Sequence, residues 1–529
     1  MNSTVSTNGT NGTDGTDGTV STDTDVVIVG AGPVGLMLAG ELRLAGVDCV
    51  VLEKSPQAAD QSRALGFTAR TIETFDQRGL LPRFGGFDTI PVGHFGGVML
   101  DYREVEGGSY GAKGVPQSLT TAVLEAWALG LGADLRRGRE VTAFTAGEDH
   151  VEVTSAGPGG PARLRARYLV GCDGARSTVR KQAGIAFPGH DARIEMCFAE
   201  VSGVRVRPRP NGERVEGGLV LAFQQGPDTF RVTYYERGAA PGPDRTPPSF
   251  ARVAAAWQRL TGEDIRGGRP LWAGRFTDAS RQAAAYRKGR VLLAGDAAHI
   301  HLPIGGQGMS AGVQDAVNLG WKLALDIKGR APAGLLDTYH AERHPVGARV
   351  LLNTLTQRAL YISGEEMQPL RDLFGELAEH AEVRRHLIGM VTGLDIRYDV
   401  GPGRHPLLGR RLPGRELVVG GPAGKTTTTA LLHPGRGVLL DLADDARVRA
   451  AAAGWADRVD TVSARPHPDP DPDGGGDGGG DGFGGACLLV RPDGYVAWAG
   501  GGSAGTRGLE GALARWFGAP ALPGQARHA

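Results

Sequence analysis

Apolar residues near the start of the chain recur with the spacing of a strand–helix–strand unit. Residues 26–29 form a short apolar run of the length of a buried parallel strand, and residues 47–52 form a second. Between them, Leu36, Leu38 and Leu42 lie in a stretch without helix breakers, which predicts a helix that ends at Gly46. Further apolar runs at 168–170 and 291–293 fit the same sheet. The pattern predicts an α/β domain with a parallel sheet.

The pattern changes twice further along the chain. Residues 196–275 alternate between apolar and polar positions and are divided by Pro/Gly turns, which predicts an inserted antiparallel sheet that forms a lid or floor for a substrate pocket. Residues 331–400 are helical in pattern, and strand-like pieces return beyond residue 404. We therefore expect a first domain of residues 24–195 and 276–403 with a helical extension at 331–403, a substrate domain of 196–275, and a C-terminal domain of 404–529.

One long helix is expected after residue 308. Met309, Val313, Val317, Trp321 and Ala324 mark its buried face, and the pattern places Asp315, Asn318 and Lys322 off that face.

Composition narrows the class of protein. The 529 residues contain 58 Lys+Arg and 58 Asp+Glu, so no global basic field favours nucleic acid or an anionic membrane. No apolar run is long enough to span a bilayer, and no signal peptide is evident, so the cytoplasm is the expected location. The four cysteines are widely spaced without a C-x-x-C, which indicates neither a metal site nor a disulfide framework. Residues 1–23 and 466–485 are of low complexity and predict a disordered tail and a flexible loop.

The turn between the first strand and helix carries a complete G-x-G-x-x-G, Gly30-Ala31-Gly32-Pro33-Val34-Gly35. Gly30 allows the tight turn, Gly32 lets the backbone approach a pyrophosphate, and Gly35 lets the helix pack on the strand. Glu53 ends the second strand, where a carboxylate can bond the hydroxyls of an adenosine ribose. The alternative is a glycine turn that occurs by chance. The complete unit with Glu53 favours a dinucleotide.

Two further strands each deliver an aspartate to the sheet edge where ligands bind in α/β folds. The first leads into Asp173-Gly174-Ala175-Arg176-Ser177-Thr178-Val179-Arg180, and the second into Asp296. A structural alternative for the first is an Asp-Gly turn in which Ser177 caps a helix. The positive start of the helix beyond Asp296 suits a flavin, whose reduced ring carries negative charge. His299 and His301 lie near this loop without an evident acidic partner, which favours structural roles for them.

Gly424-Lys425-Thr426 resembles the end of an ATP-binding phosphate loop. Val419 stands where the first glycine is required, and β-prone threonines follow where a helix should begin. An ATP site is therefore rejected.

The three motifs, in this order, resemble those of the single-component FAD-dependent aromatic hydroxylases of the p-hydroxybenzoate hydroxylase type. The closer resemblance, over nearly all of residues 25–529, is to hydroxylases of angucyclinones, which are bacterial aromatic polyketides. The stretches that carry it include GFTARTIETFDQRGLLPRFG, VPQSLT, HIHLPIGGQGMSAGVQDAVNLGWKL, HPLLGRRLPG and TTTTALLHPGRGVLLDL. The resemblance implies a thioredoxin-like C-terminal domain. Without a C-x-x-C this domain is expected to serve as a scaffold or as a homodimer contact.

The resemblance also implies roles for individual residues. Glu53 would hold the adenosine ribose, Arg63 the pyrophosphate, and Gln117 and Asp296 the ribitol. Asp173 would belong to a motif shared between FAD and NADPH binding. Many relatives carry Asn at the position of Ser310. Because Ser has no side-chain amide, the resemblance implies no amide contact to the flavin ring from this position. The full set of expected FAD-binding residues is Gly30, Gly32, Pro33, Val34, Gly35, Glu53, Lys54, Arg63, Gln117, Asp173, Asp296, Pro303, Gly305, Gly306, Gly308 and Met309.

By the same resemblance, NADPH is a co-substrate that reduces FAD, and dioxygen then forms a C4a-hydroperoxide that hydroxylates an aromatic polyketide. No catalytic base is identified from the sequence. Baeyer–Villiger oxygenation of a polyketide and a flavoprotein that binds a polyketide without turnover remain alternatives. A flavin halogenase is not favoured, because the seven tryptophans never occur as W-x-W.

Overall fold

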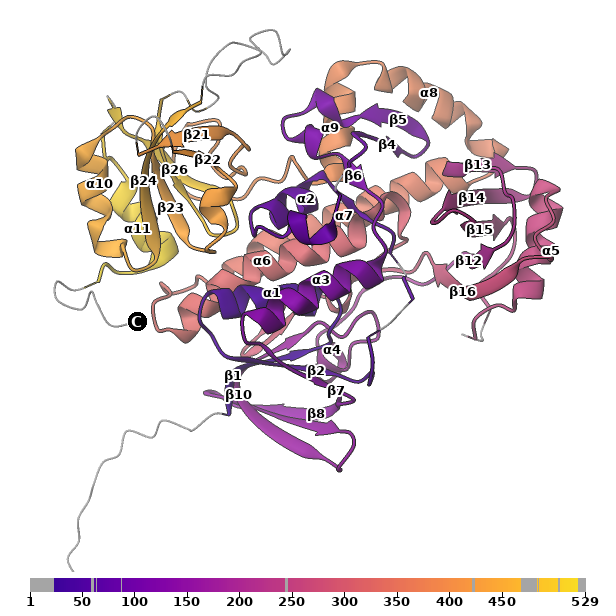
Figure 1. The fold of residues 1–529 in the computed structure, drawn as a ribbon, viewed down its shortest axis with the longest axis horizontal. Helices are drawn as coiled ribbons and strands as arrows, with labels where there is room; N and C mark the ends of the chain where they lie inside the picture. Colours follow the sequence, from indigo (N-terminus) through magenta and orange to yellow (C-terminus); the bar gives the residue numbers. More distant parts are fainter. Residues whose placement is uncertain are drawn as a thin grey trace, which may run out of the picture.

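The computed structural model describes residues 23–58, 61–62, 64–86, 88–242, 246–420, 424–467, 483, 485–502 and 505–521. Arg63 and nearly all of the predicted flexible segments 1–23 and 466–485 lie outside the described residues. The described part has the predicted α/β architecture, with an antiparallel sheet beside the parallel one and a separate C-terminal sheet (Figure 1).

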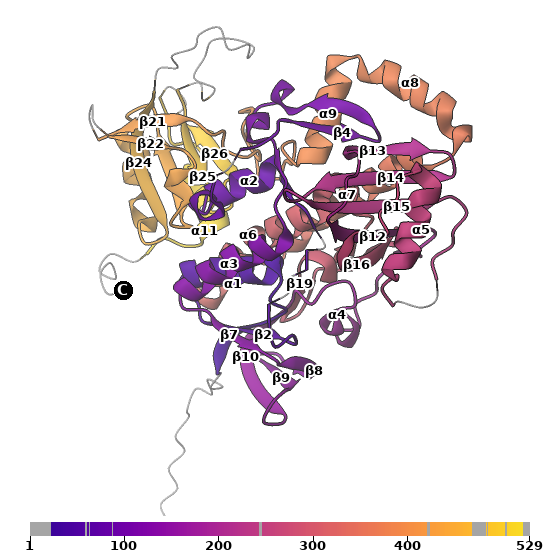
Figure 2. The same ribbon diagram turned by 45° about the vertical axis from the view of Figure 1, so that its right-hand side comes forward.

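A mainly parallel sheet forms the base of the fold, with strand order β18-β19-β10-β1-β2-β7. Its strands are β1 (Thr24–Val29), β2 (Cys49–Glu53), β7 (Asp134–Arg137), β10 (Ala162–Gly171), β18 (Arg287–Lys288) and β19 (Val291–Leu293). The antiparallel strands β8 (Glu140–Ala146) and β9 (Val151–Ala156) extend it from β10. Helices α1 (Pro33–Leu44), α3 (Gln117–Gly130) and α6 (Gln307–Ile327) lie side by side above it (Figures 1 and 2). The apolar runs are therefore the buried strands that the sequence predicts.

The inserted antiparallel sheet has the order β13-β14-β15-β12-β16. Its strands are β12 (Glu195–Ser202), β13 (Arg209–Val215), β14 (Gly218–Gln224), β15 (Thr229–Glu236) and β16 (Arg269–Thr277). Helix α5 (Phe250–Thr261) packs on one face through Val253 and Trp257. On the sheet, Met196, Leu219 and Tyr235 form a cluster with Leu302 and with Tyr361 of α7. Through this cluster the sheet is in contact with the loop that precedes α6.

A helical layer joins these parts. It contains α7 (Thr338–Ile362), α8 (Gln368–Ala378) and α9 (Ala381–Thr392), and the hairpin of β4 (Val92–Phe95) and β5 (Val98–Asp101) packs against it. Shorter elements complete the connections: α2 (Ala69–Asp76), α4 (Thr178–Gln182), β3 (Phe67–Thr68), β6 (Ala112–Lys113), β11 (Gly189–His190), β17 (Ser280–Gln282) and β20 (His299–Ile300). Among the described residues, no helix is both long enough and apolar enough to span a bilayer.

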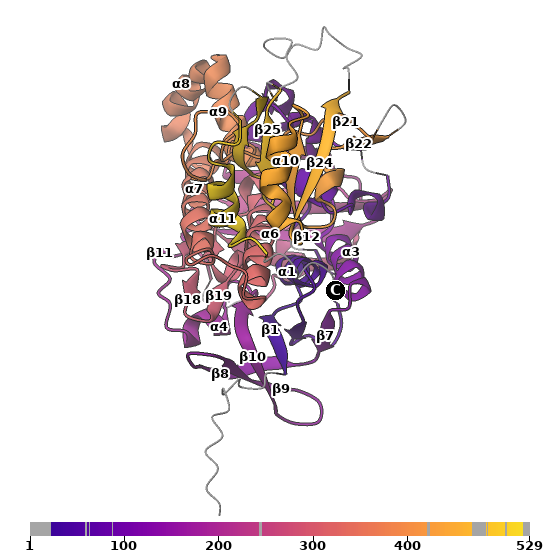
Figure 3. The ribbon, with the colours of Figure 1, turned by 90° about the vertical axis from the view of Figure 1, so that its left-hand side faces the viewer.

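The C-terminal unit, which faces the viewer in Figure 3, has a six-stranded sheet of order β22-β21-β24-β23-β25-β26. Its elements are β21 (Glu416–Val419), β22 (Lys425–Thr427), β23 (Gly437–Asp441), α10 (Ala446–Ala452), β24 (Val459–Pro466), β25 (Cys487–Val490), β26 (Val496–Gly500) and α11 (Leu509–Phe517). The parallel pair β23–β24, followed by the antiparallel β25 and β26, gives the predicted thioredoxin-like arrangement. Lys425 begins a strand, so no phosphate-loop helix follows Gly424.

The three polar residues that the pattern places off the buried face of α6 are themselves buried. Asp315, Asn318 and Lys322 are 1%, 2% and 0% exposed. Helix α6 is enclosed by α1, α2, α7 and the C-terminal unit, and these three side chains are paired inside this packing. Hydrophobic periodicity predicts which face of a helix is apolar and buried. It does not predict that other elements bury the polar face as well by providing charged partners for it.

A buried ionic network joins the C-terminal unit to α6 and α7. Arg491, which is fully buried, donates to Glu342 at 2.6 and 2.8 Å and to Asp493 at 3.0 Å. Lys322 donates to the same Glu342 at 2.7 Å, and Asn318 bonds both Glu342 and Asp493. The turn Pro492-Asp493-Gly494, which joins β25 to the antiparallel β26, therefore lies at the contact that docks the C-terminal unit.

Candidate dinucleotide-binding site

The glycine turn between β1 and α1 has the geometry that its three glycines require. Gly30 has φ +104°, and a Cβ there would lie 2.5 Å from the carbonyl oxygen of Cys172. A Cβ on Gly35 would lie 2.0 Å from the carbonyl oxygen of Gly30, so strand and helix approach too closely for any side chain. In contrast, a Cβ on Gly32 would meet no heavy atom within 4 Å. Gly30 and Gly35 thus serve the fold, whereas Gly32 leaves an open approach to the backbone.

The start of α1 has the features of an anion-binding site. Gly32 is the N-cap and supplies no side-chain hydrogen bond, and Pro33 occupies the first turn without an acidic neighbour. The first backbone N–H groups of a helix lack partners within the helix, and the helix dipole makes this end positive. Because Gly32 leaves space beside it, a pyrophosphate can reach these groups.

Glu53 lies where the sequence places it, beside the turn. Its Oε2 accepts a hydrogen bond from the amide of Ala31 at 2.8 Å, and its Oε1 accepts one from the amide of Ser55 at 2.8 Å. The adjacent Lys54 is exposed. Gln117, at the start of α3, accepts from the amide of Ala64 at 3.1 Å and so holds the loop that precedes β3.

Asp173 follows β10 and organises the start of α4. Its Oδ2 accepts from the amides of Thr178 at 2.6 Å and Val179 at 3.1 Å, and Ser177 caps the helix as the structural alternative expects. Its Oδ1 is buried and has no hydrogen-bond partner among the described residues. Arg180 donates to the carbonyl oxygens of Ala175 and Ala297 at 2.9 and 2.8 Å. Arg180 therefore links the second motif to the third.

The third motif meets the first at the same sheet edge. Gly295 has φ +60°, and a Cβ there would lie 2.9 Å from Cγ2 of Val34 in the first turn of α1. A Cβ on Gly312 of α6 would lie 2.6 Å from the same atom. Asp296 follows directly and is exposed. The ends of β1, β10 and β19 thus bring Gly30–Gly35, Asp173 and Asp296 into one neighbourhood.

The loop Pro303–Met309 leads into α6 through left-handed backbone at Gly305 (φ +71°) and Gly306 (φ +66°). Gly306 is the N-cap of α6 and supplies no side-chain hydrogen bond, so the positive end of this helix is also open. Gly308 and Met309 lie in its first turn. Two helix starts, those of α1 and α6, therefore border one site.

Sequence reasoning missed the acid that pairs with His299. The Nε2 of His299 lies 2.8 Å from Oδ2 of Asp315, and Arg343 donates to Oδ1 of the same carboxylate at 2.7 Å. Burial raises the pKa of Asp315, but Arg343 and His299 outweigh that effect and hold the pKa below its ordinary value. The amide of Gly295 also donates to Asp315 at 3.1 Å. This buried triad fixes the turn that carries Asp296.

His301 is held as a neutral ring. Its Nδ1 lies 2.8 Å from the carbonyl oxygen of Leu302, which identifies Nδ1 as the protonated nitrogen, since a carbonyl only accepts. Burial lowers the pKa of His301 to about 4.

Two protein-family models match the chain: an FAD binding domain over residues 23–354 and an aromatic-ring hydroxylase C-terminal domain over residues 405–520. The 12-dehydrotetracycline 5-monooxygenase/anhydrotetracycline 6-monooxygenase of Streptomyces rimosus is 45% identical over 516 residues, which cover 94% of this chain and 99% of that protein. The solved structure of CabE, an aromatic hydroxylase from angucycline biosynthesis, is 58% identical with a TM-score of 0.88, over 94% of this chain and 100% of that one.

The Diels-Alderase PyrE3 of pyrroindomycin biosynthesis, 38% identical with a TM-score of 0.79, shares the fold over 94% of this chain and 100% of its own. The two solved structures share the fold over nearly the whole chain, and the family models and the sequence relative agree with them. The open helix starts and the crowded glycines of the site suit a dinucleotide. The chain therefore belongs to the family of FAD-binding aromatic-ring hydroxylases and is a flavoprotein monooxygenase.

Proposed function

We propose that the protein uses bound FAD and the co-substrate NADPH to hydroxylate a polycyclic aromatic polyketide of the angucyclinone type in antibiotic biosynthesis. The observation that carries the proposal is the meeting of the Gly30–Gly35 turn, Asp296 and the start of α6 at one sheet edge, beside an apolar cluster. Identity of 58% to CabE, which is named for angucycline biosynthesis, supports the angucyclinone class.

The residues at this edge fit the successive parts of FAD. The carboxylate of Glu53 would bond the adenosine ribose, since each of its oxygens keeps a second lone pair. Amides at the start of α1 would hold the pyrophosphate, and Gln117 and Asp296 the ribitol. Pro303, Gly305, Gly306, Gly308 and Met309 would border the ring, with the positive end of α6 favouring negative charge on it. When bound, FAD supplies hydride acceptance and activation of dioxygen.

The substrate would lie between the antiparallel sheet and α7. Met196, Leu219 and Tyr235 of the sheet are in contact with Leu302 and Tyr361 in an apolar cluster. The ring centroid of His94, from the hairpin of β4 and β5, lies 5.2 Å from that of Tyr361. An apolar site with few polar groups suits a flat polycyclic ligand. In this position the residues exclude water and hold the ring for oxygen transfer.

NADPH would bind transiently, because the one dinucleotide unit that the sequence reveals is assigned to FAD. Asp173, at the edge shared by both cofactors, would act mainly through the start of α4, which its Oδ2 holds. The predicted division of the chain into domains at 24–195 with 276–403, 196–275 and 404–529 is part of the proposal. So is the role of the last domain as a scaffold or homodimer contact.

The test is incubation of the purified protein with NADPH and an angucyclinone precursor under heavy-isotope oxygen gas. A product that carries the label supports monooxygenation, and its mass and fragmentation distinguish ring hydroxylation from Baeyer–Villiger insertion. An oxygenated product with oxygen only from water would refute the proposal. Absence of any oxygenated product, with FAD bound, would favour a polyketide-binding protein or a cyclisation such as the name of PyrE3 implies for that relative.

The cofactor assignment has its own test. Asp296→Ala should weaken FAD binding by about 1–3 kcal/mol, the cost of one lost hydrogen bond in such a site. Titration of the apoprotein with FAD, followed by flavin fluorescence, measures this loss. Equal affinity of the variant and the unmodified protein would contradict the role of Asp296.

A further inference from the structure

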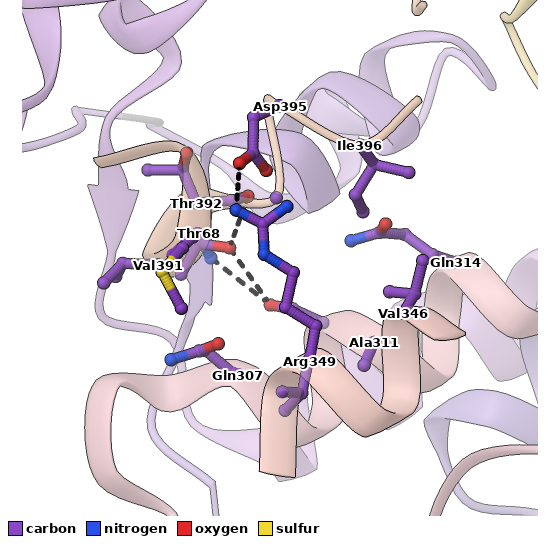
Figure 4. Close-up of a pocket in the computed structure, with 14 residues that line it drawn as sticks. Thr68, Gln307, Ala311, Gln314, Val346, Arg349, Val391, Thr392, Asp395 and Ile396 are labelled. Carbon is purple, nitrogen blue, oxygen red and sulfur yellow. Dashed lines mark hydrogen bonds and ion pairs between the residues drawn. The ribbon is translucent and has the colours of Figure 1, made fainter. Parts of the chain in front are cut away.

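A cavity of about 40 Å³ lies between α6, α7 and the end of α9, with Thr68 of β3 at its edge (Figure 4). Much of its wall is aliphatic and includes Val346 and Val391. Polar side chains of Gln307 and Gln314, two turns apart on α6, also line it. At its rim, Arg349 and Asp395 form an ion pair with side chains 38% and 30% exposed, so the rim reaches the surface.

Two amide groups on this wall lack hydrogen bonds that a buried group needs. Gln307 and Gln314 are 4% and 8% exposed. The carbonyl oxygen of Gln307 accepts from Asn353 at 2.9 Å, but among the described residues neither Nε2 of Gln307 nor Oε1 of Gln314 has a partner. An unsatisfied buried amide costs about 1–3 kcal/mol, and native proteins satisfy such groups with protein or ordered water.

Water fits both the volume and the chemistry. A space of about 40 Å³ holds about two or three water molecules by the usual requirement per molecule. The side chains of Gln307, Ser310 and Gln314 line it, together with the ion pair at the rim. Gln314 also borders a second space of about 10 Å³ beside Asn318 and Asp493, which has room for about one water molecule.

We propose that this cavity is an ordered-water site whose water carries protons between the buried start of α6 and solvent at the Arg349–Asp395 pair. The inference rests on the proposed function, in which the start of α6 borders the flavin ring. Each transfer breaks one O–H bond of water and forms another, so a proton enters at one end as another leaves, without any redox change. The charged groups nearest the path are Arg349 and Asp395 at the rim, and Arg70 and Asp493 at the second space.

The experiment compares two cavity variants with one control in the FAD-loaded protein. Gln314→Leu removes the acceptor at similar volume, and Val350→Leu fills the cavity with apolar volume while keeping both glutamines. Gln258→Leu makes the same chemical change on α5, remote from the cavity. Crystals of each at high resolution, with and without xenon pressure, report whether the cavity holds water. Stopped-flow absorbance after a pH jump across the ionisation of oxidised flavin reports how fast protons reach the ring.

Ordered water should occupy the cavity in the unmodified protein and in Gln258→Leu, and fewer molecules should remain in the two cavity variants. The flavin response should slow by roughly tenfold in those variants, as the loss of one hydrogen-bonded step of ordinary strength implies. A dry cavity that takes up xenon would overturn the proposal, and so would ordered water combined with an unchanged flavin response. Failure of every form, including the unmodified protein, to bind flavin would instead refute the proposed function.

Discussion

Replacement of Arg491 by Met tests whether the buried ionic network holds the C-terminal unit on the rest of the fold. Arg491 is 0% exposed, and it donates to Glu342 at 2.6 and 2.8 Å and to Asp493 at 3.0 Å. Met fills much of the volume of the Arg side chain but offers no donor. The two carboxylates would then remain buried without their main counter-ion.

Removing one partner of a buried ion pair costs about 3–5 kcal/mol of the free energy of unfolding. The loss for Arg491→Met should lie near the lower end of this range, because Glu342 keeps its hydrogen bonds from Lys322 at 2.7 Å and from Asn318 at 2.7 Å. Asp493 keeps Asn318 at 3.1 Å. We therefore expect a loss of about 3 kcal/mol. Changing Asp493 to Asn in the same chain should recover part of this loss, since Asp493 is the carboxylate that loses its charged partner.

The matched control is Arg415→Met. Arg415 pairs with Glu106 across the same two parts of the chain, but these side chains are 42% and 47% exposed, and such pairs contribute about 0–1 kcal/mol. Urea unfolding, followed by circular dichroism, and thermal melting at one scan rate would compare the variants with the unmodified protein. Equal shifts for Arg491→Met and Arg415→Met would refute the reasoning, because the difference in burial would then have no effect.

Three further predictions use other parts of the molecule. Gly32→Ala should leave the melting temperature unchanged but weaken FAD binding by roughly tenfold or more. Gly35→Ala should lower the free energy of unfolding by about 1–3 kcal/mol or more, because only its added Cβ would meet backbone atoms. Equal losses of stability in the two variants would contradict this reasoning. Burial lowers the pKa of Lys322 to about 8 from 10.5, so the unfolded chain binds more protons between these values and stability should rise with pH across that window. Lys322→Met should reduce that rise in unfolding free energy, and an identical pH profile would count against the shift. Cys487→Ser should keep full turnover, because the thiol donates to Asp441 at 3.1 Å, remote from the site, as a serine hydroxyl also can; lost activity in a folded variant would reveal chemistry in the C-terminal unit.

The sequence alone determined the parts of the fold that depend on local backbone demands. Gly30 requires a left-handed φ and Gly35 a close approach of helix to strand, so their spacing specifies the turn wherever it occurs. The apolar runs at β1, β10 and β19 specified a buried sheet, and the aspartates that follow β10 and β19 indicated the sheet edge at which we propose that FAD binds. These features are carried by residues close together in the chain.

Only the tertiary structure decided which charges are buried and with whom they pair. Asp315 and Lys322 resemble solvent-facing positions of an amphipathic helix, yet both are enclosed, because α7 and the C-terminal unit cover the side of α6 that the pattern left open. Asp315 pairs with His299 and Arg343, which lie 16 and 28 residues away, and Glu342 pairs with Arg491 at a separation of 149 residues. Pairs so far apart along the chain leave no periodic pattern in the sequence. Their free energy depends on the removal of water by elements that meet only in the folded protein.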